Sequence, residues 1–177
     1  MLPALLALLC LPALGASAQP RPKLIIGESL PDLALPRLEG GKLALRGLRG
    51  QPVAISFFSR YCEPCRRELP TLQRVLARLN RELPAKRQVL GVVISLDSAD
   101  ETRAQARLAP SMRWLLDPDG HARAQFDPRT FPCTFLADAT SRVRHINRGF
   151  GSGYEARVER WLRGLLGGPP GSEAPGR

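Results

Sequence analysis

The chain has 177 residues and carries 26 Lys or Arg against 16 Asp or Glu, which gives a formal net charge of +10. This length and a hydrophobic fraction of 44% are those of one globular domain, and they exclude a wholly disordered chain. Only the first stretch is apolar for long enough to suggest a membrane, which excludes a polytopic membrane protein. The arginines are spread along the chain, so we interpret them as solvated surface and expect no nucleic-acid partner.

The first 18 residues have the pattern of a secretory signal peptide. Residues 2–14 are apolar and uncharged, and Ala16-Ser17-Ala18 offers the small-x-small pattern of a cleavage site. We therefore expect residues 1–18 to be removed and residues 19–26 to form a polar lead-in. The mature protein is expected to be exported, to the periplasm or another extracytoplasmic compartment, and to be soluble there.

Strands and helices alternate in the hydrophobic pattern that follows. In the first half, the pattern predicts a hairpin around 39–41, a strand at 53–58, an amphipathic helix with leucines at 69–83 and a strand at 89–96. In the second half, it predicts a helix at 99–108, a strand at 114–116, a turn at 117–120, strands at 134–137 and 143–147, and a helix at 154–166. This order predicts one α/β domain over residues 27–166, with helices on both faces of a central sheet. A Gly/Pro-rich tail at 167–177 is expected to be disordered.

Cysteine chemistry is predicted where the first long strand gives way to the first long helix. The mature chain would keep Cys62, Cys65 and Cys133, an odd number that excludes a framework of structural disulfides. At the start of a helix, unsatisfied backbone N–H groups and the helix dipole favour the thiolate of Cys62, which makes it the expected nucleophile. Cys65 is placed one turn later to attack a mixed disulfide on Cys62. Pro64 fits the first turn and stiffens the loop between the sulfurs.

A zinc site is a weaker interpretation of the cysteine pair. The only other candidate ligands are Cys133, His121 and His145, and neither histidine has a ligand-like spacing to a cysteine. We therefore expect no metal ligand among these residues and interpret both histidines as surface residues.

Two separated motifs resemble the thioredoxin superfamily. Residues 56–70, in which Cys-Glu-Pro-Cys is followed by Glu-Leu-Pro, resemble the TlpA/ResA branch of exported thiol-disulfide oxidoreductases. Residues 117–120 and 131–138 are similar to the turn and the cis-proline strand of the family. The resemblance covers residues 27–166 and implies a thioredoxin-like fold, a central mixed β-sheet flanked by helices on both faces. It also implies that Pro132 is the cis-proline, which packs beside the disulfide and presents backbone to an incoming peptide.

The same resemblance implies a thiol-disulfide exchange on protein partners, in which Cys62 attacks and Cys65 resolves. The redox-active disulfide would be the only redox group, with no other cofactor. In the family the direction is usually reduction within an oxidising compartment, for example of the haem-binding cysteines of apocytochrome c or of thiols at a copper site. Electrons come from a membrane-side thiol donor. We expect the same of this chain, acting as a monomer.

Three positions depart from the family pattern. Tyr61 replaces the usual tryptophan and is expected to keep an aromatic lid. Ser56 stands where thioredoxin has a buried aspartate that helps the second cysteine lose its proton, so Glu63 or Asp97 is a candidate for that role, or none serves. An acid that ends a strand, as Asp97 does, also commonly caps a helix. Cys133 replaces the usual threonine, and it is either a small buried hydrophobe or a third functional thiol.

Two other functions stay open at this point. A copper-binding or copper-delivery protein would use Cys62, Cys65 and Cys133 as soft ligands. A peroxidase of the peroxiredoxin kind shares the fold, and Ser59 lies three residues before Cys62, as its motif requires. Ile55, however, replaces the proline of that motif.

Overall fold

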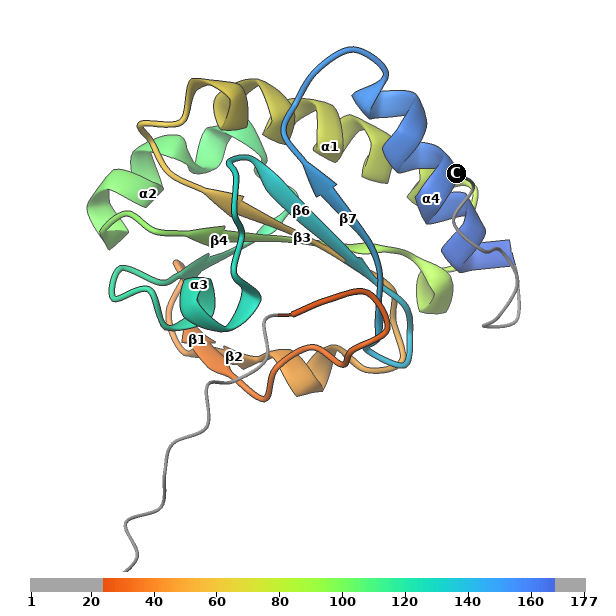
Figure 1. Ribbon diagram of the computed structural model, residues 1–177, viewed down its shortest axis with the longest axis horizontal. Coiled ribbons are helices and arrows are strands. Elements are labelled where there is room, and N and C mark those ends of the chain that lie inside the picture. The colour runs from red at the N-terminus through yellow and green to blue at the C-terminus, as the bar shows by residue number, and fades with distance from the viewer. Residues whose placement is uncertain (1–23, 168–177) are drawn as a thin grey trace, which may run out of the picture.

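The computed structural model describes residues 24–167. The expected signal peptide at 1–18, most of the lead-in at 19–26 and nearly all of the expected tail at 167–177 lie outside the described residues. The centre of the molecule is a five-stranded sheet in the order β5-β4-β3-β6-β7 (Figure 1). Its strands are β3 (Val53–Phe58), β4 (Leu90–Ser95), β5 (Arg113–Leu116), β6 (Cys133–Ala137) and β7 (Val143–Arg148). β3, β4 and β5 are parallel, whereas β6 is antiparallel to both β3 and β7, so the predicted mixed sheet is confirmed.

The sheet separates two hydrophobic layers. The helices are α1 (Glu63–Arg81), α2 (Ala99–Gln105), α3 (His121–Phe126) and α4 (Tyr154–Gly167), and a separate hairpin is formed by β1 (Ala34–Pro36) and β2 (Lys42–Ala44). α1 and α4 lie together on one face (Figure 1). α3, the hairpin and the 3-10 turn Leu45–Leu48 cover the other face. Helices therefore lie on both faces, as predicted.

Buried side chains of β3 alternate between the two layers. Ile55 and Phe57 face α3 and the hairpin, whereas Ala54 and Phe58 face α1 and α4. This alternation follows from the pleat of a strand, whose successive side chains point to opposite faces. It explains why the whole apolar run is buried and why it predicts a central strand.

One short helix, α3, was not predicted. Its six residues are too few to show a helical period, and its start depends on the turn before it. The Asp117 carboxylate accepts hydrogen bonds from the backbone N–H groups of Ala122, at 3.0 Å, and Arg123, at 2.8 Å. Gly120 supplies the left-handed conformation at the N-cap, with φ of 73°. The predicted turn at 117–120 is therefore confirmed and leads into α3.

The motif residues lie together at one end of the strands, where β3 and β4 finish and β6 begins; this end is the active-site edge of the sheet. β3 and β4 are parallel, so Cys62, which follows β3, and Asp97, which follows β4, leave the sheet at the same edge. β6 is antiparallel to β3 and pairs Cys133 with Phe57, which brings Pro132 to this edge as well. Among the described residues, no helix is long and apolar enough to cross a membrane.

Two glycines offer a matched test of the packing. A Cβ added to Gly91 in β4 would lie 2.8 Å from Leu76 Cδ1 and 2.8 Å from Met112 Cγ, whereas one added to Gly164 in α4 meets nothing within 4 Å. We expect Gly91→Ala to lower the free energy of unfolding by about 1–3 kcal/mol through overpacking. Gly164→Ala should raise it by about 0.5–1 kcal/mol, because alanine favours the helix. Urea unfolding followed by circular dichroism measures both changes, and a stabilised Gly91→Ala protein would contradict the packing described.

Candidate active site

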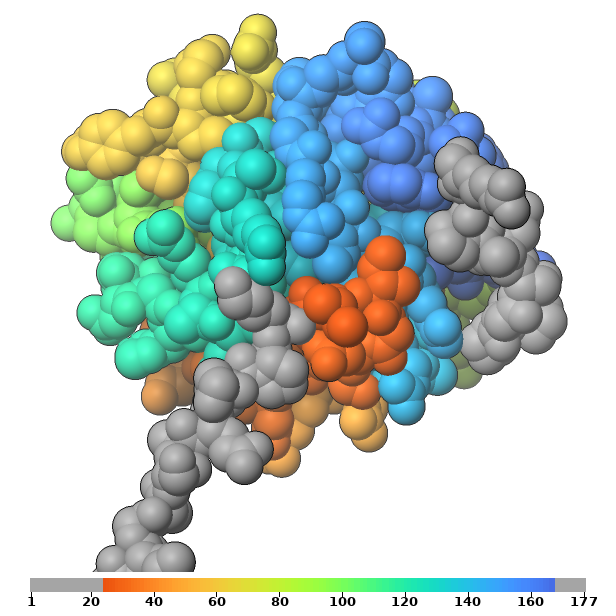
Figure 2. Space-filling model, in the orientation of Figure 1, coloured from red at the N-terminus to blue at the C-terminus, as the bar shows by residue number. Residues whose placement is uncertain are grey.

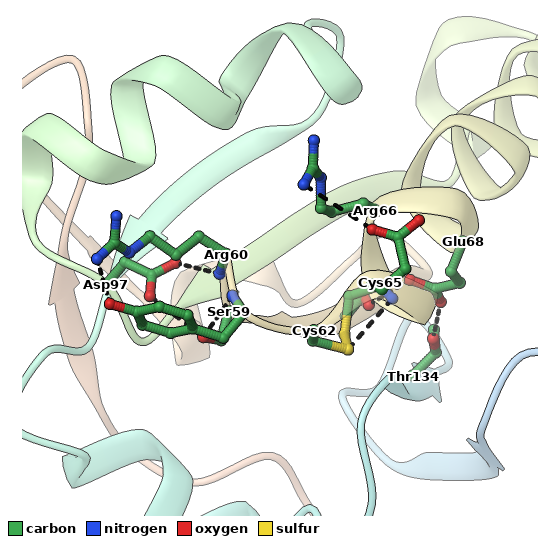
Figure 3. Close-up of a disulfide and its surroundings, with 11 residues drawn as sticks. Ser59, Arg60, Cys62, Cys65, Arg66, Glu68, Asp97 and Thr134 are labelled. Carbon is green, nitrogen blue, oxygen red and sulfur yellow. Dashed lines mark hydrogen bonds and ion pairs between the residues drawn. A yellow bond between two sulfur atoms is a disulfide. The ribbon is translucent and has the colours of Figure 1, made fainter.

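A disulfide joins Cys62 and Cys65 at the N-terminus of α1, with their Cα atoms 5.3 Å apart (Figure 3). Cys62 is the N-cap residue, and its Sγ accepts a hydrogen bond from the backbone N–H of Cys65 at 3.2 Å. Pro64 occupies the first turn of the helix. Cys62 is partly exposed, whereas Cys65 is fully buried. An attacking protein can therefore reach only the first sulfur.

Asp97 fixes the loop that leads into Cys62. Its carboxylate accepts hydrogen bonds from the backbone N–H of Arg60 at 2.6 Å and from the Ser59 hydroxyl at 3.2 Å (Figure 3). The cap of α2 is the next residue, Ser98, so Asp97 is not a helix cap. Asp97 is 6% exposed and directs both oxygens to this loop. The loop is thus held from the end of the neighbouring strand, while a proton-accepting role for Asp97 stays a prediction.

Tyr61 stands in solvent beside the disulfide. Its side chain is 79% exposed, and the Arg60 guanidinium lies over its ring at 4.3 Å and hydrogen-bonds its hydroxyl. Arg60 in turn pairs with Glu101 at 3.0 Å. The ring is thus held at the surface by Arg60, and the expected aromatic lid stays a prediction. Glu63 is also exposed and lies 3.8 Å from Arg66, its nearest ion-pair partner.

A buried acid that the sequence did not single out lies one turn after Cys65. The Glu68 side chain is fully buried and accepts hydrogen bonds from Ser56 at 2.9 Å, from Tyr154 at 2.6 Å and from Thr134. Burial raises the pKa of Glu68 above its ordinary value, and the three hydrogen bonds offset part of that rise. Cys65 and Glu68 are three residues apart in α1, which places both on the helix face turned to the sheet. The position of Glu68 within the apolar face of the predicted helix was the sequence signal that could have identified this buried acid.

The peptide bond between Phe131 and Pro132 is cis, in the segment that leads into β6. The Pro132 carbonyl accepts a hydrogen bond from the backbone N–H of Gly149 at 2.8 Å, which ties this segment to the end of β7. The backbone N–H and C=O of Phe131 make no hydrogen bond with any of the described residues. The residue before the cis-proline therefore presents unpaired backbone groups at the edge that carries the disulfide.

Cys133 packs as a small hydrophobe. It is fully buried in the layer of Phe57 and α3, whereas Cys65 lies in the opposite layer. Burial raises the pKa of Cys133 to about 12. The three cysteines are therefore not brought together, and no group of three metal-binding side chains occurs at residues 24–167. The geometry gives no support to the three-cysteine copper site.

The comparisons with known proteins agree with this geometry. The model of the AhpC/TSA family matches residues 26–146. The chain belongs to the AhpC/TSA family. The thiol-disulfide oxidoreductase ResA of Bacillus cereus (strain ZK / E33L) is 34% identical over 146 residues, which cover 80% of this chain and 79% of ResA. The thioredoxin-like protein YneN of Bacillus subtilis is 27% identical over 128 residues, 70% of this chain and 71% of YneN.

Solved structures place this family member in the thioredoxin fold. A protein from Chlorobium tepidum described as the thiol:disulfide interchange protein DsbE superposes with a TM-score of 0.73 at 24% identity, over 82% of this chain and 100% of that one. The likeness to that structure is one of fold. Together with the ResA and YneN matches, it makes the chain a TlpA/ResA-like member of the thioredoxin superfamily and a protein thiol-disulfide oxidoreductase.

Within this family member, Ser59 does not favour a peroxidase. Its hydroxyl donates to Asp97 and accepts from the Tyr61 backbone, while Ile55 is buried in the core at the position of the peroxidase proline. The Ser59 hydroxyl is thus engaged in holding the loop.

In the fully reduced protein, iodoacetamide should label Cys62 first. Cys62 is partly exposed at a helix N-terminus, whereas Cys65 and Cys133 are fully buried and the pKa of Cys133 is raised to about 12. Mass mapping after brief labelling at neutral pH measures the order. Preferential labelling of Cys65 would reverse the assigned roles, and early labelling of Cys133 would contradict its burial.

The buried acid should give stability a particular pH dependence. The folded pKa of Glu68 lies above its ordinary value of 4.5, so the folded protein keeps a proton that the unfolded chain has already lost. The free energy of unfolding should therefore fall as pH rises from about 4.5 through the folded pKa, and Glu68→Gln should abolish this fall. Guanidinium unfolding at a series of pH values compares the two proteins. The exposed Glu39→Gln serves as the control, and parallel profiles for Glu68→Gln and the natural chain would refute the assignment.

Proposed function

We propose that this oxidoreductase is a reductase of protein disulfides. The observation that carries the proposal is the asymmetry of the cysteine pair, an accessible Cys62 above a buried Cys65, next to a cis-proline segment with unpaired backbone. A protein substrate can present a disulfide to Cys62 while its backbone pairs beside Pro132. The substrates that the family resemblance suggests are cysteine pairs at haem-attachment or copper sites.

The reduction proceeds in two exchanges between sulfurs. The Cys62 thiolate attacks one sulfur of the substrate disulfide, so that a mixed disulfide forms and the other substrate sulfur leaves as a thiolate. The Cys65 thiolate then attacks Cys62 Sγ, which closes the Cys62–Cys65 disulfide and releases the second substrate thiolate. Solvent protonates the two released thiolates. Two electrons pass to the substrate, and the two sulfurs are the only redox groups that the proposal requires.

Glu68 supports both the proton transfer and the reducing direction. Its raised pKa lets it hold a proton nearer to neutral pH than an ordinary carboxyl, so it can accept the proton that Cys65 must lose. Before it takes that proton Glu68 is charged, and its charge disfavours a thiolate in the same buried layer. A reduced form whose thiolate is not stabilised is oxidised more readily, which makes the cysteine pair a stronger reductant. We therefore propose Glu68 for this role, beside the candidates Glu63 and Asp97 that the sequence offered.

Export and an electron donor complete the proposal. We propose that the protein acts in an extracytoplasmic compartment, because the apolar residues 2–14 precede a cleavage pattern, and that it acts there as a monomer. A reductase in an oxidising compartment must be reduced again after each turnover. A thiol donor on the membrane side would supply those electrons.

The reduction potential of the cysteine pair tests the direction. We expect a value near or below about −270 mV, that of thioredoxin, and a value near about −120 mV, that of DsbA, would make the protein an oxidant. Equilibration in dithiothreitol buffers, followed by alkylation and mass analysis, measures it. Cys133→Thr is the matched control and should leave the potential unchanged, because Cys133 lies in the layer opposite Cys65. A shifted potential in that variant would give Cys133 a redox role after all.

A further inference from the structure

Phe131 offers two backbone groups to which an extended peptide can hydrogen-bond. Its N–H and C=O are unpaired within the described part of the chain, although the neighbouring Pro132 and Cys133 are tied to β7 and β3. Phe131 lies at the end of the inner strand β6, between β3 and β7, and its free backbone groups can hydrogen-bond an extended peptide laid across this end of the sheet. Figure 2 shows the blue-green segment that leads into β6 at the surface, between the yellow segment that holds the start of α1 and the blue loop that follows β7.

Two arginines lie near this backbone on the α3 face of the sheet, and we call them the arginine rim. The guanidinium of Arg123, in α3, lies 5.9 Å from the centre of the Phe131 ring. Arg148 ends β7 directly opposite Cys133 and precedes Gly149, whose N–H holds the Pro132 carbonyl. Both side chains are exposed. The rim therefore borders the site where a peptide would pair.

Four acids near this end of the sheet are already engaged elsewhere. Glu101 pairs with Arg60 and Glu63 with Arg66, while the Asp117 carboxylate holds two backbone N–H groups of α3. Asp127 pairs with Arg129 at 3.2 Å. Neither Arg123 nor Arg148 has an ion-pair partner among residues 24–167. Their charges are left for a partner outside the molecule.

We propose that the arginine rim selects substrate segments in which acidic residues flank the reacting cysteine. This inference rests on the proposed function and names its substrate class. A segment that pairs with Phe131 would lay its flanking side chains near the rim, where Asp or Glu would meet Arg123 or Arg148. Guanidinium groups bind carboxylates through paired hydrogen bonds, and complementary charge also raises the rate of encounter.

Three synthetic peptides test the selection. They have one length and one internal disulfide, and their flanking residues are Glu, Gln or Lys. The protein is reduced with dithiothreitol and desalted, mixed with each peptide, quenched with acid and assayed for reduced peptide by chromatography. We expect the Glu peptide to react about tenfold faster than the Lys peptide at low ionic strength. The ratio should approach one at about 1 M salt, where charges are screened within about 3 Å.

Variants locate the preference on the rim. The double variant Arg123→Glu/Arg148→Glu should invert the ratio of the Glu and Lys rates, and the milder Arg123→Gln and Arg148→Gln should each reduce it. The control is Arg49→Glu, an exposed arginine that precedes β3 and lies at the opposite end of that strand from Cys62; it should keep the natural ratio. A double variant that keeps the natural ratio would overturn the inference.

A small uncharged disulfide separates the two levels of the proposal. Reduction of 2-hydroxyethyl disulfide requires the cysteine pair alone, and it also shows that each variant is folded and competent. If the natural protein reduces this compound but treats the three peptides alike, the rim has no selective role and the proposed function stands. If it reduces neither the compound nor any peptide, the proposed function is wrong, and the selection fails with it.

Discussion

The carboxylate of Glu68 is the constraint on which the active site depends. A buried carboxyl group is costly unless its oxygens are hydrogen-bonded, and here three hydroxyls from β3, β6 and α4 supply those bonds. α1 cannot slide or rotate on the sheet without breaking this set. The position of its N-terminus, and with it the disulfide, is thus fixed from inside the core. The loop before the disulfide is fixed independently by Asp97, from the end of β4.

Two opposing electrostatic influences meet within the first turns of α1. The N-terminus of the helix stabilises negative charge on Cys62, and the acid on the inner face opposes it at Cys65. The exposed Cys62 is therefore the better nucleophile and attacks first, whereas the buried Cys65 acts in the second exchange. The same contrast would set the potential, because the dithiol is stabilised by the first influence and destabilised by the second. Relatives with different acids or hydroxyls around this turn would have different potentials on the same scaffold.

The sequence predicts the sheet, the long helices and the cysteine motif because each has a strong local pattern. Leucines at helical spacing predict α1, and continuous apolar runs predict β3 and β4. The helix α3 is too short for a period, and a carboxylate at Asp117 that holds backbone groups decides where it begins. The partners of Glu68 lie 12, 66 and 86 residues away along the chain, so no local pattern could assemble them. The contact of the Tyr61 ring with Arg60 likewise depends on side-chain packing that no sequence pattern indicates.

Because Cys133 is buried, the rate at which its thiol is labelled reports how often the core around it unfolds. The sheet separates this thiol from the redox pair, and Cys133 is fully buried in the layer of α3. A thiol in such a place reacts with reagent only when the surrounding core comes apart, so its labelling rate follows the free energy of that larger opening. In an oxidising compartment the third cysteine also carries a risk during folding. Until the hydrophobic layer that buries Cys133 has formed, its thiol can form a wrong disulfide with Cys62 or Cys65. Early closure of the layer formed by β3, β6 and α3 would therefore protect the redox chemistry of the other layer before it begins.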